Sequence, residues 1–332
     1  MRRISVGVNW QGPLDRDGML ADAQVADESG VHMITVAEAW GRDAITLLAL
    51  LAYTTKNIQL GTSIINSFSR TPAAIAQHFT TLDQVSNGRM MIGLGTSGPQ
   101  VIEHFHGIPF DKPITRLREY VEIINMLVAG EPLHYQGKIF NLDRGFSLRH
   151  LGDLPRRHIP IFLGSQGPVS VKLAAELADG WLAPAAGKGG WKQQVGDFYA
   201  QVAAFGRDPS TVEITAGGAH VTEDVDKVYD GVRQQTAFNM AKMGELHYKN
   251  FHRIGLGEVA DEVRRLWREQ GSAAAYAAVT DDVVQQRAYA GPVEGAIDWI
   301  EEQKEAGYTQ SSVSIAERDP KKRAEIYRKL VG

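Results

Sequence analysis

The sequence contains no cysteine, which excludes disulfide bonds, thiolate metal ligands and a cysteine nucleophile. It also has no apolar run of about 18 residues, so it predicts no membrane-spanning helix. The opening stretch MRRISVGVNWQG is interrupted by polar residues and is not expected to be a signal peptide. A formal net charge of −4 argues against a nucleic-acid-binding protein, which would present a basic face. These absences favour a soluble, cytoplasmic globular protein.

What the sequence does have is a repeated alternation of strand-like and helical patterns. Apolar residues recur every two positions in the strand-like stretches and about every 3.6 positions in the helical stretches. Eight such pairs predict a parallel sheet closed into a (β/α)8 TIM barrel with insertions. We expect one domain over residues 1–332, with insertions at about 131–158 and 238–290. The eight strands are expected at 4–10, 32–40, 58–66, 89–95, 159–164, 181–184, 212–221 and 311–316.

One motif favours a different fold at first sight. Residues 93–98, GLGTSG, match the G-x-G-x-x-G pattern of dinucleotide-binding Rossmann domains. A Rossmann domain needs this turn after its first strand, with an acidic residue about 20 positions later at the end of a second strand. Here the motif ends the fourth strand, and the positions 116–120 lie in an expected helix. The barrel is therefore the better interpretation.

Two small-residue loops are expected at the active-site face, where the carboxyl ends of barrel strands meet. One is Gly95–Pro99, and the other lies in FLGSQGP at 162–168; each precedes a helix that a proline opens. Free backbone N–H groups and the hydroxyls of Thr96, Ser97 and Ser165 suit an anionic group such as a phosphate. The alternative is that the glycines only form tight turns.

Several spaced motifs occur together and in order: VAEAWGRDAITLLALLA, LGTSIINSFSRTPAAIAQ, LDQVSNGRMMIGLGTSGP, EHFHGIPFDKP and ELADGWLAP. With them the chain resembles the bacterial luciferase-like superfamily. Within it, the chain is most similar to the branch that uses coenzyme F420, a deazaflavin, typified by methylenetetrahydromethanopterin reductase. The resemblance covers nearly the whole chain.

The resemblance implies a homodimeric (β/α)8 barrel that holds a flavin or deazaflavin at its carboxyl-terminal mouth and acts on a small-molecule substrate. It implies a cis peptide bond between Ser63 and Ile64, placed against the cofactor ring. It also implies that hydride passes between C5 of the deazaflavin and that substrate. The implied cofactor-binding residues are Glu38, Trp40, Ser63, Ile64, Asn66, Thr96, Ser97, Gly98, Gly164, Ser165 and Gln166.

The chain departs from the family pattern at two positions. Many relatives carry a histidine after the acidic residue of the second strand, where Glu38 is here followed by Ala39. Some deazaflavin-dependent sugar dehydrogenases have a glutamate in place of Gly98. Both departures argue against sugar oxidation, which needs a base for the hydroxyl proton. They leave hydride transfer possible, because the cofactor carries that chemistry.

The candidate catalytic residues are Glu38, Asn9 and His104. A buried Glu38 with a raised pKa would move a proton, and its alternative role is as a structural partner of Arg42 or Asn66. Asn9 either orients a ligand or fixes its loop. His104 or its neighbour His106 is a candidate acid, since histidine titrates near neutral pH.

Other polar residues have competing interpretations as well. The spacing of His104 and His106 does not place them on one helix face, and no third ligand is evident, so no metal site is expected. Trp40 flanks the cofactor ring or forms a lid, and Arg70 and Lys188 meet an anionic cofactor tail or lie on the surface.

Two alternatives to an F420-dependent oxidoreductase stay open from the sequence. One is an FMN-dependent monooxygenase of the same superfamily, and the other is a barrel that binds a ligand without catalysis. The Met- and aromatic-rich segment FNMAKMGELHYKNFHRIG, residues 238–255, is either ordinary core or a cover over the substrate.

Overall fold

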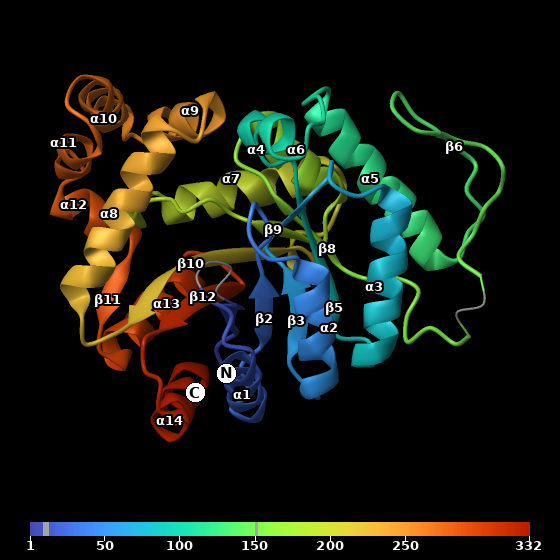
Figure 1. The fold of residues 1–332 in the computed structure, drawn as a ribbon, viewed down its shortest axis with the longest axis horizontal. Helices are drawn as coiled ribbons and strands as arrows, with labels where there is room; N and C mark the ends of the chain where they lie inside the picture. Colours follow the sequence, from blue (N-terminus) through green and yellow to red (C-terminus); the bar gives the residue numbers. More distant parts are fainter. Residues whose placement is uncertain (9–12, 150–151) are drawn as a thin grey trace.

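The computed structural model describes residues 1–8, 13–149 and 152–332 and contains a closed barrel of eight parallel strands. Neighbouring strands pair in parallel around the barrel, and the pairing of β9 with β10 and of β12 with β1 closes it. The TIM-barrel prediction is confirmed, and each expected strand is present (Figure 1). The barrel strands are β1 (Ile4–Val8), β2 (Met33–Val36), β3 (Gln59–Thr62), β5 (Met90–Gly95), β8 (Ile161–Gly164), β9 (Gly180–Leu182), β10 (Glu213–Val221) and β12 (Gln310–Ile315).

The third expected strand, 58–66, is divided in the structure. Its second part is β4 (Ile65–Asn66), which pairs with the end of β5, and β3 ends before it at Thr62. A further strand, β11 (Tyr289–Gly291), pairs with β10 outside the barrel.

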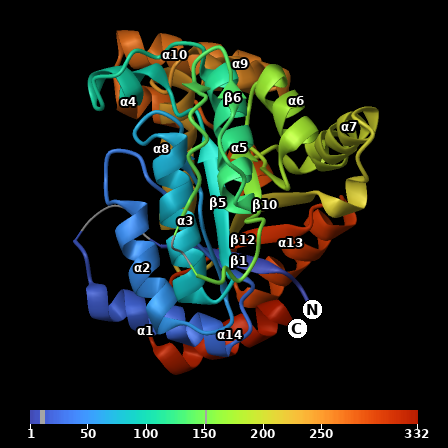
Figure 2. The same cartoon turned by 90° about the vertical axis from the view of Figure 1, so that its right-hand side faces the viewer.

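Helices surround the barrel, and their starts follow sequence rules. Thr71 caps α3 with its hydroxyl and is followed by proline, and Asp43 caps α2 in the same way with its carboxylate. Figure 2 shows α2, α3 and α5 along the outside of the barrel, and α1 beside α14 near the termini. The helices of the first half are α1 (Arg16–Glu28), α2 (Ala44–Thr54), α3 (Pro72–Ser86), α4 (Pro99–His104), α5 (Pro113–Ala129), α6 (Pro168–Leu177) and α7 (Trp191–Ala204). Those of the second half are α8 (Val225–Ala241), α9 (Glu245–Arg253), α10 (Gly257–Glu269), α11 (Ser272–Ala277), α12 (Asp281–Arg287), α13 (Val293–Glu305) and α14 (Pro320–Val331).

The barrel interior is filled at one end and open at the other. Met33, Met91 and Phe162 form a small buried cluster inside the barrel, separate from the large core between strands and helices. Further along β1, a methyl group added to Gly7 would meet nothing within 4 Å. The arrow of β2 points toward the open end, where α4 and α9 lie (Figure 1). This end is where barrel enzymes hold their substrates.

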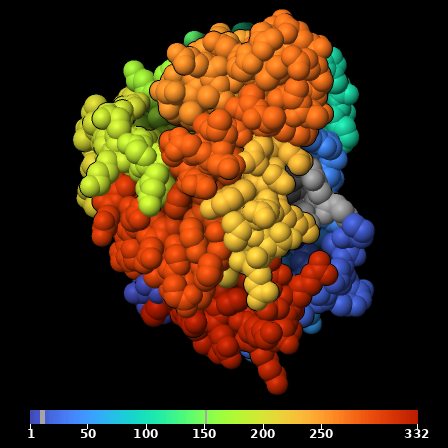
Figure 3. All heavy atoms as spheres, turned by 90° about the vertical axis from the view of Figure 1, so that its left-hand side faces the viewer, coloured from blue at the N-terminus to red at the C-terminus, as the bar shows by residue number. Residues whose placement is uncertain are grey.

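Two segments extend the simple barrel. Between α5 and β8 lies a hairpin of β6 (Tyr135–Gln136) and β7 (Asn141–Leu142), whose turn donates three N–H groups to the buried Glu119 carboxylate. Between β10 and β11, helices α8 to α12 enclose a second apolar core around Met240 and Phe251. Figure 3 shows α9 to α11 as an orange cap beside α8 in yellow. The division into one domain with two insertions stays a prediction.

In the part of the chain that the structure describes, no helix combines the length and the apolar character needed to cross a bilayer.

Candidate active site

The carboxyl ends of β2 and β3 are tied together at the open end of the barrel. The Ser63 N–H donates to the carbonyl oxygen of Val36 at 2.9 Å, and the Glu38 N–H donates to that of Ile64 at 3.1 Å. The peptide bond between Ser63 and Ile64 is cis in the structure, as the resemblance implies. Ser63 is exposed at the mouth.

The first glycine of the G-x-G-x-x-G motif lets β3 and β5 approach each other. The Thr62 hydroxyl donates to the Gly93 carbonyl oxygen and accepts from the Gly93 N–H, both at 2.9 Å. A Cβ added to Gly93 would lie 1.8 Å from the Thr62 carbonyl oxygen. No side chain fits there, so Gly93 serves strand packing.

The second glycine makes room for Ile64. A Cβ on Gly95 would lie 2.8 Å from Ile64 Cδ1, and one on Gly164 would lie 3.0 Å from Ile64 Cγ2. Gly95 and Gly164 are register partners on β5 and β8. The Ile64 side chain therefore packs over two adjacent strand ends, and both glycines are required by this packing.

The third glycine has no such constraint. Gly98 precedes α4 with extended backbone, φ −131° and ψ 161°, and its nearest neighbour is the flexible Gln100 side chain, 3.2 Å from an added Cβ. Ser97 before it has a φ of 56°, a conformation that non-glycine residues rarely adopt. Thr96, Ser97 and Gly98 are all half-buried, so this turn is accessible to a ligand.

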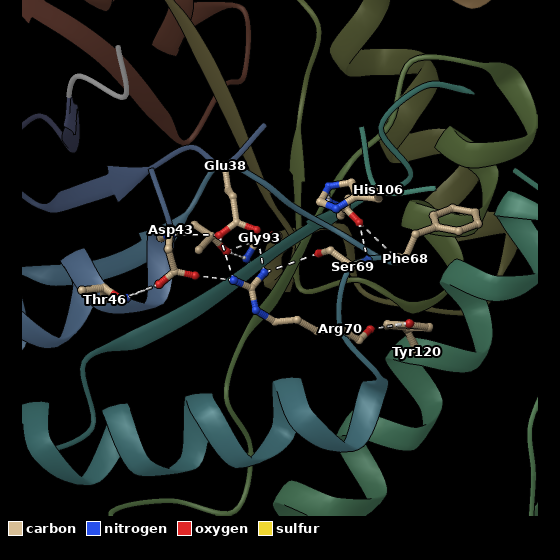
Figure 4. A network of polar contacts seen from close by, with 12 residues as sticks. Glu38, Asp43, Thr46, Phe68, Ser69, Arg70, Gly93, His106 and Tyr120 are labelled. Atoms are coloured by element: carbon tan, nitrogen blue, oxygen red, sulfur yellow. Dashed lines mark hydrogen bonds and ion pairs between the residues drawn. The ribbon is translucent and has the colours of Figure 1, made fainter. Parts of the chain in front are cut away.

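Glu38 is held in an ionic network at the end of β2 (Figure 4). Its Oε1 accepts from Arg70 Nη1 at 2.5 Å, and its Oε2 accepts from Arg70 Nη2 at 3.0 Å and from the Ala44 N–H at 2.9 Å. Arg70 also pairs with Asp43. The Glu38 side chain is 9% exposed. Its ionic partner is Arg70, a residue other than the Arg42 and Asn66 considered from the sequence.

The same network fixes Arg70. The Tyr120 hydroxyl donates to the Arg70 carbonyl oxygen at 2.6 Å. The pKa of Arg70 is raised, chiefly by its hydrogen bonds to Glu38. Burial of the guanidinium acts in the opposite direction, and the negative charges of Glu38 and Asp43 add to the increase. Arg70 is thus a permanent cation whose charge is balanced inside the protein. The interpretation of Arg70 as a surface charge is wrong, and its contacts do not reserve it for a cofactor tail.

Asn66 and His106 form the next polar group along the mouth. The buried Asn66 side chain accepts from the N–H groups of Phe68 and Ser69 at 2.9 and 2.7 Å. Its Nδ2 lies 3.5 Å from His106 Nε2 (Figure 4). His104, in contrast, ends α4 with an exposed side chain and is not brought to this group.

The loop after β8 contributes an unsatisfied hydroxyl. Ser165 Oγ is buried and has no hydrogen-bond partner among the described residues, while the Ser165 carbonyl oxygen accepts from Trp181 Nε1 at 2.9 Å. Buried polar atoms are nearly always paired in folded proteins. An orphaned hydroxyl at a strand end is therefore a feature that a bound ligand would satisfy. Gln166 beside it is half-buried.

A cavity of about 200 Å³ opens beside Ser63 and continues toward the ends of β9 and β10. Leu182, Thr215, Ser312 and Arg287 are among its lining residues. None of the described residues that line it is acidic. The cavity joins the strand ends described above to the opposite side of the mouth.

The remaining expected residues lie elsewhere. Trp40 is exposed in the loop after β2, and Lys188 pairs with Glu302 at 2.5 Å. Asn9 lies outside the described residues. Among residues 1–8, 13–149 and 152–332 no cluster of three potential metal ligands occurs. Sequence reasoning missed the pairing of Arg70 with Glu38 and the place of Arg287 in the cavity.

Comparison with known proteins agrees with this geometry. A family model described as luciferase-like monooxygenase matches residues 9–310. A protein of Mycobacterium tuberculosis, provisionally named a coenzyme F420-dependent oxidoreductase, is 34% identical over 307 residues, 87% of this chain and 88% of the relative. The 5,10-methylenetetrahydromethanopterin reductase of Archaeoglobus fulgidus is 29% identical over 291 residues, 86% of each chain.

A solved structure shows the same fold. The coenzyme F420-dependent tetrahydromethanopterin reductase of Methanopyrus kandleri superposes with a TM-score of 0.77 at 24% identity, covering 99% of this chain and 98% of the other. The fold and site thus define a luciferase-like (β/α)8 barrel. The chain belongs to the bacterial luciferase-like family, and it is an oxidoreductase.

Proposed function

We propose that this protein is a coenzyme F420-dependent oxidoreductase that transfers a hydride between C5 of the deazaflavin and a small organic substrate. The observation that carries the proposal is the combination of relatives named for F420 with a mouth where Ser165 has an unpaired hydroxyl and the adjacent turn Thr96–Gly98 is half-buried. When bound, the deazaflavin supplies the hydride chemistry itself. The chain's residues supply binding, orientation and exclusion of water.

The residues present fit such a cofactor. Ser165 Oγ lacks a partner, and the turn Thr96–Gly98 is accessible, with no acidic side chain in it. Backbone N–H groups and hydroxyls of this kind hold phosphates without needing a cation. We therefore propose Thr96, Ser97 and Gly98, with Gly164, Ser165 and Gln166, as the contacts of the cofactor phosphate.

The ring would be held by the ends of β2 and β3. Ile64 presents an aliphatic side chain that is fixed over Gly95 and Gly164, and Ser63 is exposed next to it. Contact with two strand ends restricts the conformations of this side chain, which makes it an ordered support for a ring. Asn66, also at this end, completes the proposed set, with Trp40 as an additional neighbour of the ring.

Glu38 would act here by position and charge. Its carboxylate accepts two hydrogen bonds from Arg70 and one from the Ala44 N–H. Because these contacts join the end of β2 to the start of α2 and to Arg70, we propose that Glu38 orders the loop around the ring. A proton donor is better sought at His106, which faces Asn66, than at the exposed His104. Asn9, Glu38 and His104 stay predictions as catalytic residues.

Titration of the purified protein with F420 and, separately, with FMN tests the proposal. We expect saturable binding of F420, monitored by the fluorescence of the cofactor, and much weaker binding of FMN. Tight binding of FMN without binding of F420 would make the protein an FMN-dependent enzyme of the same family. Binding of neither would contradict both.

The quaternary structure and cellular location follow from the same resemblance. We propose a cytoplasmic homodimer, and sedimentation of the purified protein tests the oligomeric state. A monomer at all micromolar concentrations would contradict the dimer.

A further inference from the structure

A second cavity adjoins the first on the side of the mouth away from Glu38. Its volume is about 410 Å³, and it lies between the end of β10 and helix α8. The two cavities share Ala185, Gly218 and Arg287 as lining residues. Together they lead from Ser63, at the proposed cofactor site, to the inner face of α8.

The described residues that line the two cavities include cations and no carboxylate. Arg287 and Lys227 line the second cavity, with His220 and the amides of Gln235 and Asn239. Within the part of the chain that the structure describes, neither cavity is lined by an acidic residue.

Arg287 has contacts that fix it but do not neutralise it. Its Nη1 donates to the Ala185 carbonyl oxygen at 3.0 Å, and its guanidinium carbon lies 5.1 Å from the centre of the Phe251 ring. Burial lowers the pKa of Arg287 to about 10, and no carboxylate among the described residues raises it again. The side chain remains cationic at neutral pH. Arg287 is half-buried and has no carboxylate partner among the described residues, so this position favours an anion.

His220 adds a hydrogen-bonding group and no charge. It projects from β10 into the second cavity, and burial lowers its pKa below the usual value. It is therefore neutral at pH 7. Lys227 is exposed near the start of α8 and supplies a second cation at the rim. A half-buried cation, an exposed cation and neutral donors suit a carboxylate or a phosphate ester.

We propose that the substrate is a small organic anion whose carboxylate or phosphate group binds at Arg287, with Lys227 and His220, while its reacting carbon lies near Ser63. This inference rests on the proposed function, since it places the substrate next to the cofactor site. The two are separate in space: the proposed cofactor contacts lie at the ends of β2, β3, β5 and β8, and the anion site lies at β10, α8 and α12.

Binding of inorganic phosphate and of acetate at low ionic strength tests the inference by calorimetry, with and without saturating F420. We expect saturable binding of at least one of the two anions, and we expect F420 not to displace it. Arg287→Gln should weaken that binding at least about tenfold, and Lys227→Gln about threefold, as loss of charge-assisted hydrogen bonds implies. Arg253→Gln and Lys249→Gln, at exposed positions outside both cavities, should change it less than about twofold.

Three results would overturn the inference: no saturable binding of either anion, equal binding by wild type and both cavity variants, or displacement of the anion by F420. Displacement would assign Arg287 to the anionic tail of the cofactor. If Arg287→Gln unfolds at a lower temperature, the exposed Lys227→Gln variant carries the test alone. Failure of F420 to bind, with anion binding intact, would contradict the proposed function and leave the anion site standing.

Discussion

Replacement of each motif glycine by alanine tests whether the G-x-G-x-x-G turn is built for packing. In Gly93→Ala the new Cβ would lie 1.8 Å from the Thr62 carbonyl oxygen, whereas ordinary contacts begin at 3.4 Å. The strands must therefore separate by about 1.5 Å, which strains a tightly packed barrel. That movement also weakens two hydrogen bonds between the Thr62 hydroxyl and Gly93, each worth about 1 kcal/mol. The free energy of unfolding should fall by about 3–5 kcal/mol.

The other two positions provide graded controls. In Gly95→Ala the clash is with Ile64 Cδ1, the end of a side chain and not backbone, so we expect a smaller loss of about 1–2 kcal/mol as Ile64 repacks. In Gly98→Ala the backbone is already extended and the nearest neighbour is flexible, so the change should be within about 1 kcal/mol of zero.

Urea unfolding, monitored by circular dichroism, measures the free energy of unfolding of all three variants under one set of conditions. Equal slopes against urea concentration would show that the denatured states are comparable. The reasoning is refuted if Gly93→Ala is as stable as Gly98→Ala, or if Gly98→Ala is the most damaging change. Either result would mean that the turn is constrained by something other than the approach of β3 to β5.

Three further predictions follow from particular contacts. Gly98→Asp should weaken F420 binding at least about a hundredfold, because a carboxylate would repel the phosphate proposed there; unchanged affinity in a fluorescence titration would place the phosphate elsewhere. Arg70→Met should lower the free energy of unfolding by about 2–4 kcal/mol, because it leaves the Glu38 carboxylate with the Ala44 N–H as its donor. The double variant with Glu38→Gln should recover part of this stability, and urea unfolding that shows no recovery would contradict the pairing of Arg70 with Glu38. The pKa of His158 is raised above its usual value of 6.5, chiefly by the hydrogen bond to Asp179, while partial burial acts in the opposite direction. The contribution of His158 to the free energy of unfolding is therefore fully present below about pH 6.5 and is lost as the pH rises through the folded-state pKa. The stability difference between wild type and His158→Gln should accordingly shrink from pH 5.5 to about pH 8.5, and a constant difference would exclude titration of His158 as its source.

The barrel could be predicted because the sequence features that specify its strands and helices are local. Strand and helix periods are visible in short windows, and glycine and proline mark the turns, so the eight strands were located to within a few residues. The interruption between β3 and β4 was not evident from the alternation of apolar residues. It depends on how residues 62–65 meet β5, which is a contact between distant parts of the sequence.

The site was only partly predictable for the same reason. The accessible loops after β5 and β8 follow from their small residues, but the partner of Glu38 lies 32 residues away, and nothing in the local pattern selects Arg70 over Arg42. The choice between His104 and His106 depends on the short helix α4, which exposes the first and brings the second toward Asn66. The anion cavity joins β10, α8 and α12, which meet only in the folded chain.

A crystal structure of the complex with F420 tests the central claim most directly. The account predicts the deazaflavin ring at the barrel mouth beside Ile64, with its phosphate against Thr96–Gly98 and the loop Gly164–Gln166. It also predicts that Arg287 stays free of the cofactor. A ring bound away from the ends of β3 and β5, with the mouth otherwise formed, would contradict the account.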